Sequence, residues 1–301
     1  MLKGLRNWLG KAVCDWLNAQ RPPRPYPLCD FQRVSYELKQ ADILLVEGRS
    51  RVSDIIKHVT HSPWTHAAIY IGRFYDIEGD GLRQIVRRFY DGPPDQQLLI
   101  ESMLGAGTIV TPLNHYRHDH IRICRPTYLS PSDARRVIRY VIQRLGYQYD
   151  VRQLFDMARF FLPYPLIPKR WRSTLFEHHP GRHTRTVCST LLADAFASVH
   201  YPILPFINRD AQGETRFYRR SPKLFAPRDF DYSPYFDVIK YPYLELNEIE
   251  LYRRLPWDKS GKICDDEGVC YAPDSSREQR GERKVAFPDW TKKGIKEENT
   301  A

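Results

Sequence analysis

The sequence has little that would mark a secreted or membrane-spanning protein. Six cysteines are scattered over 301 residues, which is too few for a disulfide framework. No apolar run approaches the ~20 residues that span a bilayer. Residues 1–11 lack the continuous apolar core and the small-residue cleavage site of a signal peptide. We therefore expect a cytoplasmic protein with reduced thiols.

The charge of the chain is strongly basic and unevenly distributed. The formal net charge is +10, and residues 258–301 hold nine basic and ten acidic side chains, so the excess lies in residues 1–257. A basic body favours anionic partners such as phospholipid head groups, nucleic acid or cell-wall polymers. Since the sequence contains no nucleic-acid-binding motif, we expect no nucleic-acid partner. Residues 258–301 are polar, and we expect a flexible tail.

Residues 1–40 are expected to precede the main domain, which we place at residues 41–257. Within them, residues 2–19 predict an amphipathic helix with Leu and Trp on one face and Lys and Arg elsewhere. This helix either docks on the body or lies in a membrane interface, which would give peripheral association with the inner membrane surface. The Pro-rich stretch 21–27 ends any helix and predicts a stiff linker.

Short apolar runs in the main domain predict an antiparallel sheet of about five strands. In the run 64–72, Ala67, Ile69 and Ile71 alternate with His66 and Tyr70, which places the two sets on opposite faces. The expected strands cover residues 41–47, 64–72, 97–103, 108–113 and 120–125, and the expected helices cover residues 53–60, 130–145 and 150–162. The long stretch 201–251 is rich in aromatic residues and proline, and predicts covering structure more than regular elements.

Cys188 is the strongest candidate for chemistry. Apolar residues at helical spacing follow it, and Thr186 is a suitable N-cap. A cysteine in the first turn of a helix meets unpaired backbone N–H groups and the positive end of the helix dipole, which favour a thiolate. Its own N–H can also receive an oxyanion. The alternative is a buried cysteine that acts as a small hydrophobic residue.

A nucleophilic thiol needs a base and a group that orients the base. His66 is the candidate base because a strand holds its ring more rigidly than a loop would. Glu101 is the candidate orienting group, since a carboxylate within an apolar strand needs a partner such as a histidine on a neighbouring strand. The alternatives are a half-buried structural histidine and a sheet-edge glutamate paired with an arginine.

The other histidines predict different roles. His115, His118 and His120 have roughly metal-like spacing, but no carboxylate or cysteine at ligand spacing completes a set, so we expect no metal site. His183 and Arg185 lie close to Cys188 in a basic stretch and are candidates for substrate contact.

An ordered set of segments carries a family resemblance, namely residues 41–48, 53–57, 62–72, 99–102, 107–113, 146–150 and 187–191. Together they resemble the YiiX/YebB-like cysteine hydrolases, the circularly permuted branch of the NlpC-type papain-like superfamily, which is related to the lecithin:retinol acyltransferase-like proteins. The order of the candidates along the chain, strand histidine, strand glutamate and then helix cysteine, is the permuted one.

The resemblance implies a permuted papain-like α+β fold, with an antiparallel sheet packed against helices that include the one bearing Cys188. It also implies Cys188 as nucleophile, His66 as base and Glu101 as the third member of a triad. Trp64 and Tyr149 lie within the resembling segments, and with His183 and Arg185 we expect them to bind substrate.

We therefore expect a cysteine-dependent hydrolase or acyltransferase that cleaves an amide or ester bond through a thioester and needs no cofactor. Its expected substrate is a small molecule or peptide, or a lipid-like or acylated compound. Two other functions stay open. One is a peptidoglycan-type peptide endopeptidase, and the other is a non-catalytic ligand-binding module on the same fold.

Overall fold

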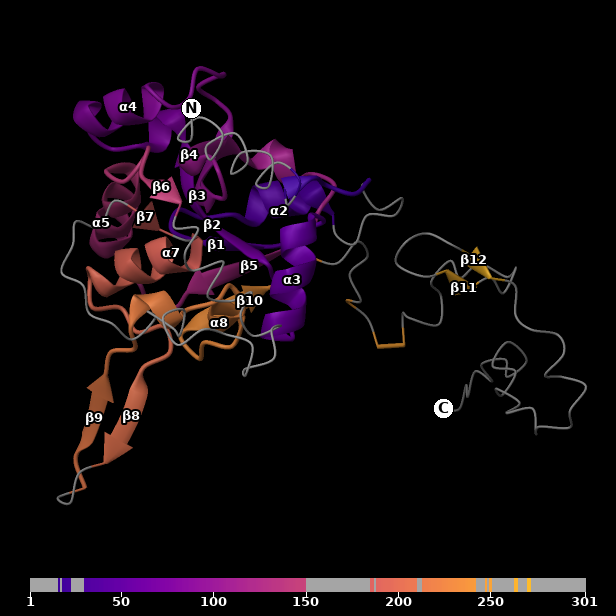
Figure 1. Cartoon of the computed structure of the whole chain (residues 1–301). Coiled ribbons are helices and arrows are strands. Elements are labelled where there is room, and N and C mark those ends of the chain that lie inside the picture. Colours follow the sequence, from indigo (N-terminus) through magenta and orange to yellow (C-terminus); the bar gives the residue numbers. More distant parts are fainter. Residues whose placement is uncertain are drawn as a thin grey trace, which may run out of the picture. The chain divides into compact units, whose positions relative to one another are not determined.

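The computed structural model describes residues 16, 18–22, 30–149, 185–186, 188–209, 213–241, 247, 249–250, 263–264 and 270–271 (Figure 1). The chain divides into two units, Met1–Glu245 and Leu246–Ala301. The described part of the second unit contains the short antiparallel pair β11 (Ile263–Cys264) and β12 (Cys270–Tyr271), in which Cys264 is opposite Cys270. All elements described below belong to the first unit.

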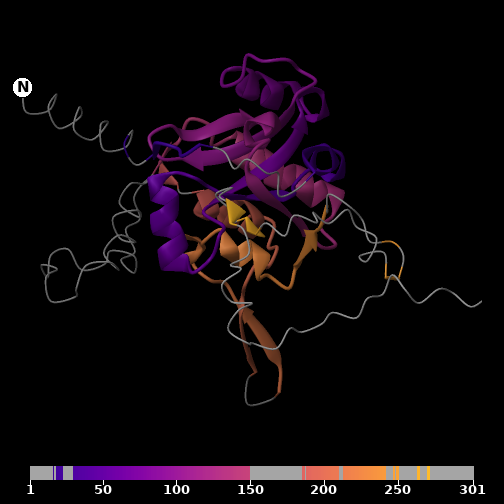
Figure 2. The same ribbon diagram turned by 90° about the vertical axis from the view of Figure 1, so that its right-hand side faces the viewer.

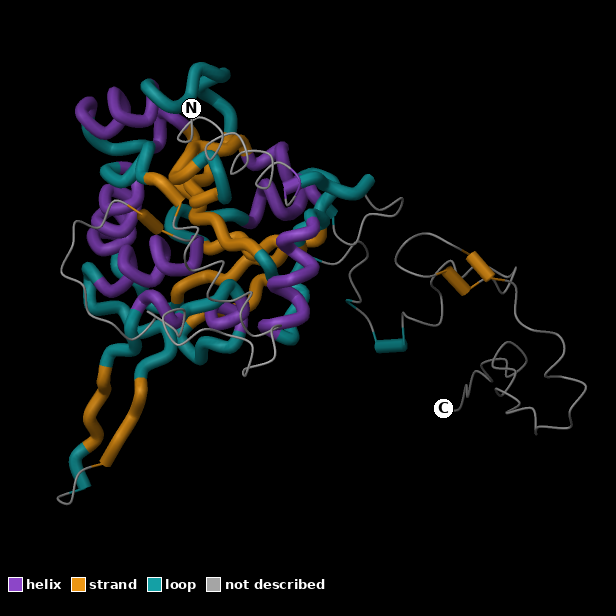
Figure 3. The backbone as a smooth tube through the Cα atoms, viewed as in Figure 1, coloured by secondary structure: helices purple, strands orange, loops and turns teal. Residues whose placement is uncertain are grey.

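A six-stranded antiparallel sheet is the centre of the first unit, with the strand order β10-β5-β1-β2-β3-β4 (Figure 3). The α+β class and the antiparallel sheet are as predicted. The sixth strand, β10, comes from the stretch 201–251, where covering structure was expected. The strands are β1 (Ile43–Glu47), β2 (His66–Arg73), β3 (Gln97–Met103), β4 (Gly107–Pro112), β5 (His120–Pro126) and β10 (Phe236–Ile239).

Both faces of the sheet are covered, which explains the composition of its central strands. Every residue of β1 is buried, in keeping with its continuous apolar run. In β2, Ala67, Ile69 and Ile71 pack into one hydrophobic cluster, whereas Ala68 and Tyr70 pack into another on the opposite face. The alternation predicted for this strand is therefore confirmed.

Two helices form much of the first cluster. α5 (Pro131–Ile142) begins at Ser130, whose hydroxyl accepts a hydrogen bond from the Asp133 N–H at 3.1 Å, as the capping pattern predicted. It ends before Gln143, so the expected end at residue 145 was too late. α7 (Cys188–Ala197) packs on α5, β2 and β3.

The start of α7 confirms one prediction and corrects another. The helix begins at Cys188, which therefore lies in its first turn. Thr186 is not the N-cap, because it lies two residues earlier, in β7 (Arg185–Thr186). This strand pairs in parallel with β6 (Gln148–Tyr149), so the backbone before the helix is tied to the chain beyond α5.

The remaining elements surround this core. The hairpin of β8 and β9 projects away from the sheet (Figure 2). The predicted helices 2–19 and 150–162 lie outside the described residues, apart from Trp16 and Asn18, which are helical. Across the described ranges, no helix is long and apolar enough to cross a membrane. The other elements are α2 (Phe31–Glu37), α3 (Arg51–Thr60), η1 (Phe74–Asp76), α4 (Asp80–Arg87), η2 (Leu113–Tyr116), β8 (Phe206–Arg209), β9 (Thr215–Tyr218), η6 (Pro222–Leu224) and α8 (Arg228–Asp231).

Candidate active site

Three side chains from β2, β3 and α7 come together beside a cavity, which two of them, His66 and Cys188, line. His66 is the first residue of β2, Glu101 lies in β3, and Cys188 is the first residue of α7. Because Ala68 is opposite Glu101 in the antiparallel pair of strands, His66 and Glu101 share a face of the sheet. α7 packs on both strands and so brings its first residue to the same point.

Glu101 is fully buried, with a side chain that is 0% exposed, and it is completely hydrogen-bonded. Its Oε2 atom pairs with Nε2 of His66 and also accepts a hydrogen bond from the Tyr116 hydroxyl. Its Oε1 atom accepts a hydrogen bond from the Thr111 hydroxyl. A buried carboxylate is stable only with such partners, and these three hold both oxygens in fixed positions.

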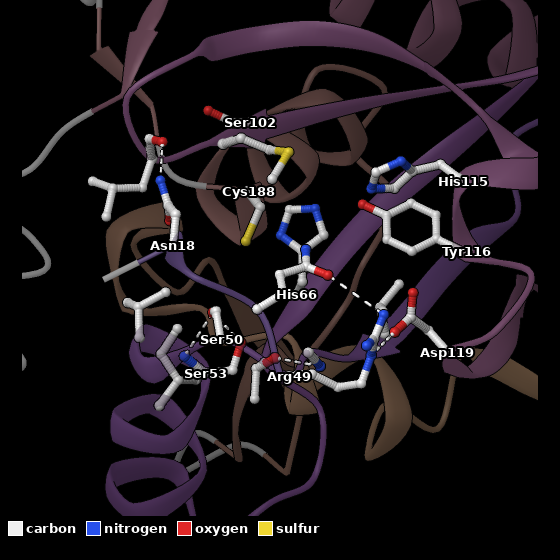
Figure 4. Close-up of a pocket in the computed structure, with 18 residues that line it drawn as sticks. Asn18, Arg49, Ser50, Ser53, His66, Ser102, His115, Tyr116, Asp119 and Cys188 are labelled. Atoms are coloured by element: carbon white, nitrogen blue, oxygen red, sulfur yellow. Dashed lines mark hydrogen bonds and ion pairs between the residues drawn. The ribbon is translucent and has the colours of Figure 1, made fainter. Parts of the chain in front are cut away.

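The Cys188 sulfur lies beside the ring of His66 (Figure 4), and it is one of the groups that raise the pKa of this ring. Since Nε2 of the ring is occupied by Glu101, the nitrogen left for the sulfur is Nδ1. Cys188 is only 5% exposed, yet it lines the cavity together with His66. The backbone N–H groups of the first turn of α7 have no partner within the helix, and they give this point a positive potential.

The charges of His66 and Glu101 depend on each other. Burial alone would lower the pKa of His66, but the Glu101 carboxylate and the Cys188 sulfur raise it to about 10. Burial alone would raise the pKa of Glu101, yet His66 and the hydrogen bonds from Thr111 and Tyr116 lower it. For Tyr116, burial and the neighbouring Glu101 raise the pKa well above its usual value, so this phenol remains a hydrogen-bond donor. The pair therefore favours an imidazolium next to a carboxylate.

The cavity has a volume of about 90 Å³ and contains both polar and apolar walls. Arg49, Asp119 and His115 contribute polar groups, and Asn18 and Gln20 reach it from the N-terminal part of the chain. The apolar lining consists of Val46, Val52, Ile56, Met103 and Leu104.

Of the four residues expected to bind substrate, Trp64 is the one whose side chain the structure describes. Trp64 is 2% exposed, its Nε1 donates to Asp231 at 3.1 Å, and the Arg122 guanidinium stacks on its ring at 4.8 Å. It is not part of the cavity lining, and these contacts are those of a structural residue. Tyr149 and Arg185 lie on the paired strands β6 and β7. The side chains of these two residues, and the whole of His183, are outside what the structure describes.

No group of three or more His, Cys, Asp or Glu side chains that could hold a metal ion is present in the described part of the chain. Two of the three histidines with metal-like spacing have separate surroundings. His120 pairs through Nδ1 with Glu47 at 2.9 Å, and its ring contacts Trp64. His115 instead lines the cavity, and its ring packs at nearly a right angle to the ring of Tyr116.

Sequence reasoning missed Tyr116 and Thr111, the two hydroxyl donors to Glu101. Thr111 lies within a segment that carries the family resemblance, so the sequence offered a weak signal for it. Tyr116 lies in the short helix η2, in a His-rich stretch with no periodicity. Nothing in that stretch indicates that its hydroxyl reaches a carboxylate in β3.

This α+β architecture, with the histidine and glutamate strands ahead of the cysteine helix, has the order of a permuted papain-like fold. Residues 37–161 match the family of permuted papain-like amidases, YaeF/YiiX, the C92 family, which confirms the predicted resemblance. The match includes His66 and Glu101 and ends before Cys188. It supports a cysteine hydrolase at the level of the superfamily.

Comparison with solved structures finds a chain described as the metalloprotein yiiX from Escherichia coli O157:H7. It is 12% identical in sequence, with a TM-score of 0.42, and the alignment covers 68% of the present chain and 98% of the other. Comparison with the curated proteins gives no match.

Proposed function

We propose that this protein is a thiol-dependent amide hydrolase in which Cys188 is the nucleophile, His66 the general acid and base, and Glu101 the group that orients His66. The observation that carries the proposal is the meeting of a sulfur, an imidazole and a buried carboxylate at one cavity. The similarity of residues 37–161 to an amidase family supports the amide as the bond that is cleaved. An ester is a chemically easier substrate for the same residues.

In the first half of the reaction, His66 holds the proton of Cys188, and the sulfur attacks the carbonyl carbon of the substrate. The new S–C bond turns the carbonyl oxygen into an oxyanion, which the Cys188 N–H and the positive end of α7 stabilise. The C–N bond then breaks while His66 gives its proton to the departing amine. A thioester on Cys188 remains.

In the second half, a water molecule attacks the thioester and gives a proton to His66. The S–C bond breaks, the acid leaves, and the proton of His66 returns the site to its starting state. Throughout, Glu101 keeps the ring in one orientation and stabilises its positive charge. An acyltransferase would differ only in the acceptor, since an amine or alcohol would take the place of water.

The lining of the cavity and the charge of the chain bear on the class of substrate. The apolar part of the lining and the basic body favour an acylated or lipid-like amide at an anionic surface, with residues 2–19 as the peripheral membrane contact. A peptide of peptidoglycan type is the alternative for the same chemistry. Hydrolysis of an N-acyl amide series and of a peptide series by the full chain, with Cys188→Ser as blank, distinguishes these two classes.

The chemistry itself is tested by alkylation with iodoacetamide, because the chain supplies an internal control. Cys124 is also a free cysteine but is fully buried in β5, where burial raises its pKa. Peptide mass spectrometry after brief exposure should show Cys188 modified well before Cys124. The variant His66→Gln should slow the modification of Cys188 alone. Equal, slow labelling of both cysteines, unchanged by His66→Gln, would favour the non-catalytic binding module.

A further inference from the structure

An N-terminal segment, residues 16 and 18–22, lies across the rim of the cavity that contains Cys188. We call it the strap. Gln20 forms an antiparallel bridge with Ser50, and the Arg21 N–H donates to the Arg49 carbonyl at 3.1 Å. On the other side, Asn18 Nδ2 donates to the Leu104 carbonyl at 2.9 Å (Figure 4). The strap thus joins the start of α3 to the turn after β3.

Arg49 is the main anchor of the strap. Its Nε donates to Asp119 Oδ1 at 2.7 Å, and the side chains of this pair are only 18% and 9% exposed. The same guanidinium donates to the Arg21 carbonyl at 2.6 Å. A planar guanidinium suits this double task, because its donors lie in a fixed fork. One side chain therefore fastens the strap to the body beside the cavity.

The strap limits the space around the sulfur. Asn18 and Gln20 line the cavity together with His66 and Cys188. The cavity measures about 90 Å³, whereas sites for drug-sized ligands measure ~300–1,000 Å³. With the strap in this position, the space beside the thiol is much smaller than a site for a drug-sized ligand.

We propose that the strap is a specificity-determining element that sets the size of the groups reaching Cys188. This inference rests on the proposed function. Small acyl groups enter with the strap in place, and larger substrates enter after the strap has moved from the rim. Asn18 and Gln20 are the residues that such substrates meet first. The strap is held by a few hydrogen bonds and by the exposed ion pair of Arg21 with Asp54, and the Arg49–Asp119 pair positions Arg49 beneath it. Its opening therefore costs much less free energy than global unfolding.

The test compares two thiol reagents, iodoacetamide as the small one and N-dodecyl iodoacetamide as the large one. For each full-length variant, the rate of modification of Cys188 is measured with both by peptide mass spectrometry, and the large-to-small ratio of rates is reported. Arg49→Met and Asn18→Leu loosen the strap at two separate anchors while they keep the side-chain volume. Arg88→Met, at an exposed position at the end of α4 and outside the cavity lining, is the matched control.

A further variant fixes the strap in its observed position with a disulfide. Bridged residues in antiparallel strands have Cα atoms ~4.5–5.5 Å apart, within the range that a disulfide spans, so Gln20→Cys with Ser50→Cys can lock it. Both single-cysteine variants are controls for the loss of each side chain, and all these proteins carry Cys14→Ser to prevent mispairing. Mass spectrometry verifies that the bridge has formed.

We expect the loosened variants to raise the large-to-small ratio about tenfold or more, and the locked variant to lower it by a similar factor. A locked variant with the same ratio as its single-cysteine controls overturns the proposal. If the disulfide does not form, the proposal is overturned when both loosened variants have the same large-to-small ratio as the parent protein. The rate with iodoacetamide distinguishes failure of the strap proposal from failure of the proposed function. If Cys188 is not an activated nucleophile, it reacts slowly with iodoacetamide in every variant, and His66→Gln does not change that rate.

Discussion

The charge of Glu101 keeps His66 protonated, and the substitution Glu101→Gln tests this directly. The two side chains are in direct contact, and two charges ~4 Å apart interact by about 4 kcal/mol at an effective dielectric constant of ~20. Since one pH unit corresponds to ~1.4 kcal/mol, removal of the negative charge should lower the pKa of His66 by about three pH units. The pKa of His66 should therefore fall from about 10 in the parent protein to about 7 or below.

The direct assay is an NMR titration of histidine ring signals, in which the His66 signal is assigned by its loss in His66→Gln. The consequence for chemistry is measured at pH 8. There the parent imidazole is almost fully protonated and the variant imidazole is protonated to about one tenth. If the imidazolium stabilises the thiolate, alkylation of Cys188 at this pH should slow by about tenfold.

Tyr116→Phe is the control, because it removes one hydrogen bond to Glu101 and leaves the carboxylate charge in place. It should move the pKa of His66 by about one pH unit or less. If Glu101→Gln leaves the pKa of His66 near 10, the reasoning is refuted, because the positive charge of the ring then has another source.

Four further outcomes are expected from the same structure. The pKa of His66 is about 10 in the folded protein and 6.5 in the unfolded chain, so protonated His66 contributes fully to the free energy of unfolding below pH 6.5. This contribution is lost as the pH rises to 10. Urea unfolding of the parent protein should show the loss, and Glu101→Gln should not. Phe196→Ala, at a fully buried position of α7, should lower the free energy of unfolding by about 3–5 kcal/mol, and a loss below ~1 kcal/mol would contradict the packing. Ser130→Ala should cost about 1 kcal/mol by the same measurement, and a neutral result would show that the cap of α5 contributes nothing. Gly107→Ala should cost more than about 1–2 kcal/mol because φ is +79° and the new Cβ would lie 2.3 Å from the Tyr147 carbonyl oxygen; an unchanged midpoint would refute this geometry.

The elements that the sequence predicted best are those whose signals are local. The alternation in β2 reflects two separate cores, one on each face of the sheet, and such an alternation is visible in any single strand. The start of α5 is fixed by Ser130 and the residues that directly follow it. Cys188 is recognisable for the same reason, since its place in the first turn depends on the helix that it begins.

The features that were missed depend on partners far away in the chain. β10 is a short strand of four residues, and only its first residue, Phe236, is buried; its place in the sheet comes from pairing with β5. Tyr116 gives no sign in its own neighbourhood that its hydroxyl ends on Glu101. The strap likewise depends on contacts of Asn18 with Leu104 and of Gln20 with Ser50, which no local pattern encodes. Such contacts follow from the packed structure, and short-range periodicity carries no information about them.

The permuted order has a physical consequence for the proposed thiol. His66 and Glu101 lie on adjacent strands and can pair as soon as β2 and β3 form their ladder. Cys188 joins them only when α7 docks on those strands, and closing so long a loop is among the slower steps of folding. Until α7 docks, the Cys188 sulfur is not next to the protonated ring of His66. If the proposed triad is correct, rapid alkylation of Cys188 during refolding should therefore appear together with the burial of α7, later than the formation of the sheet.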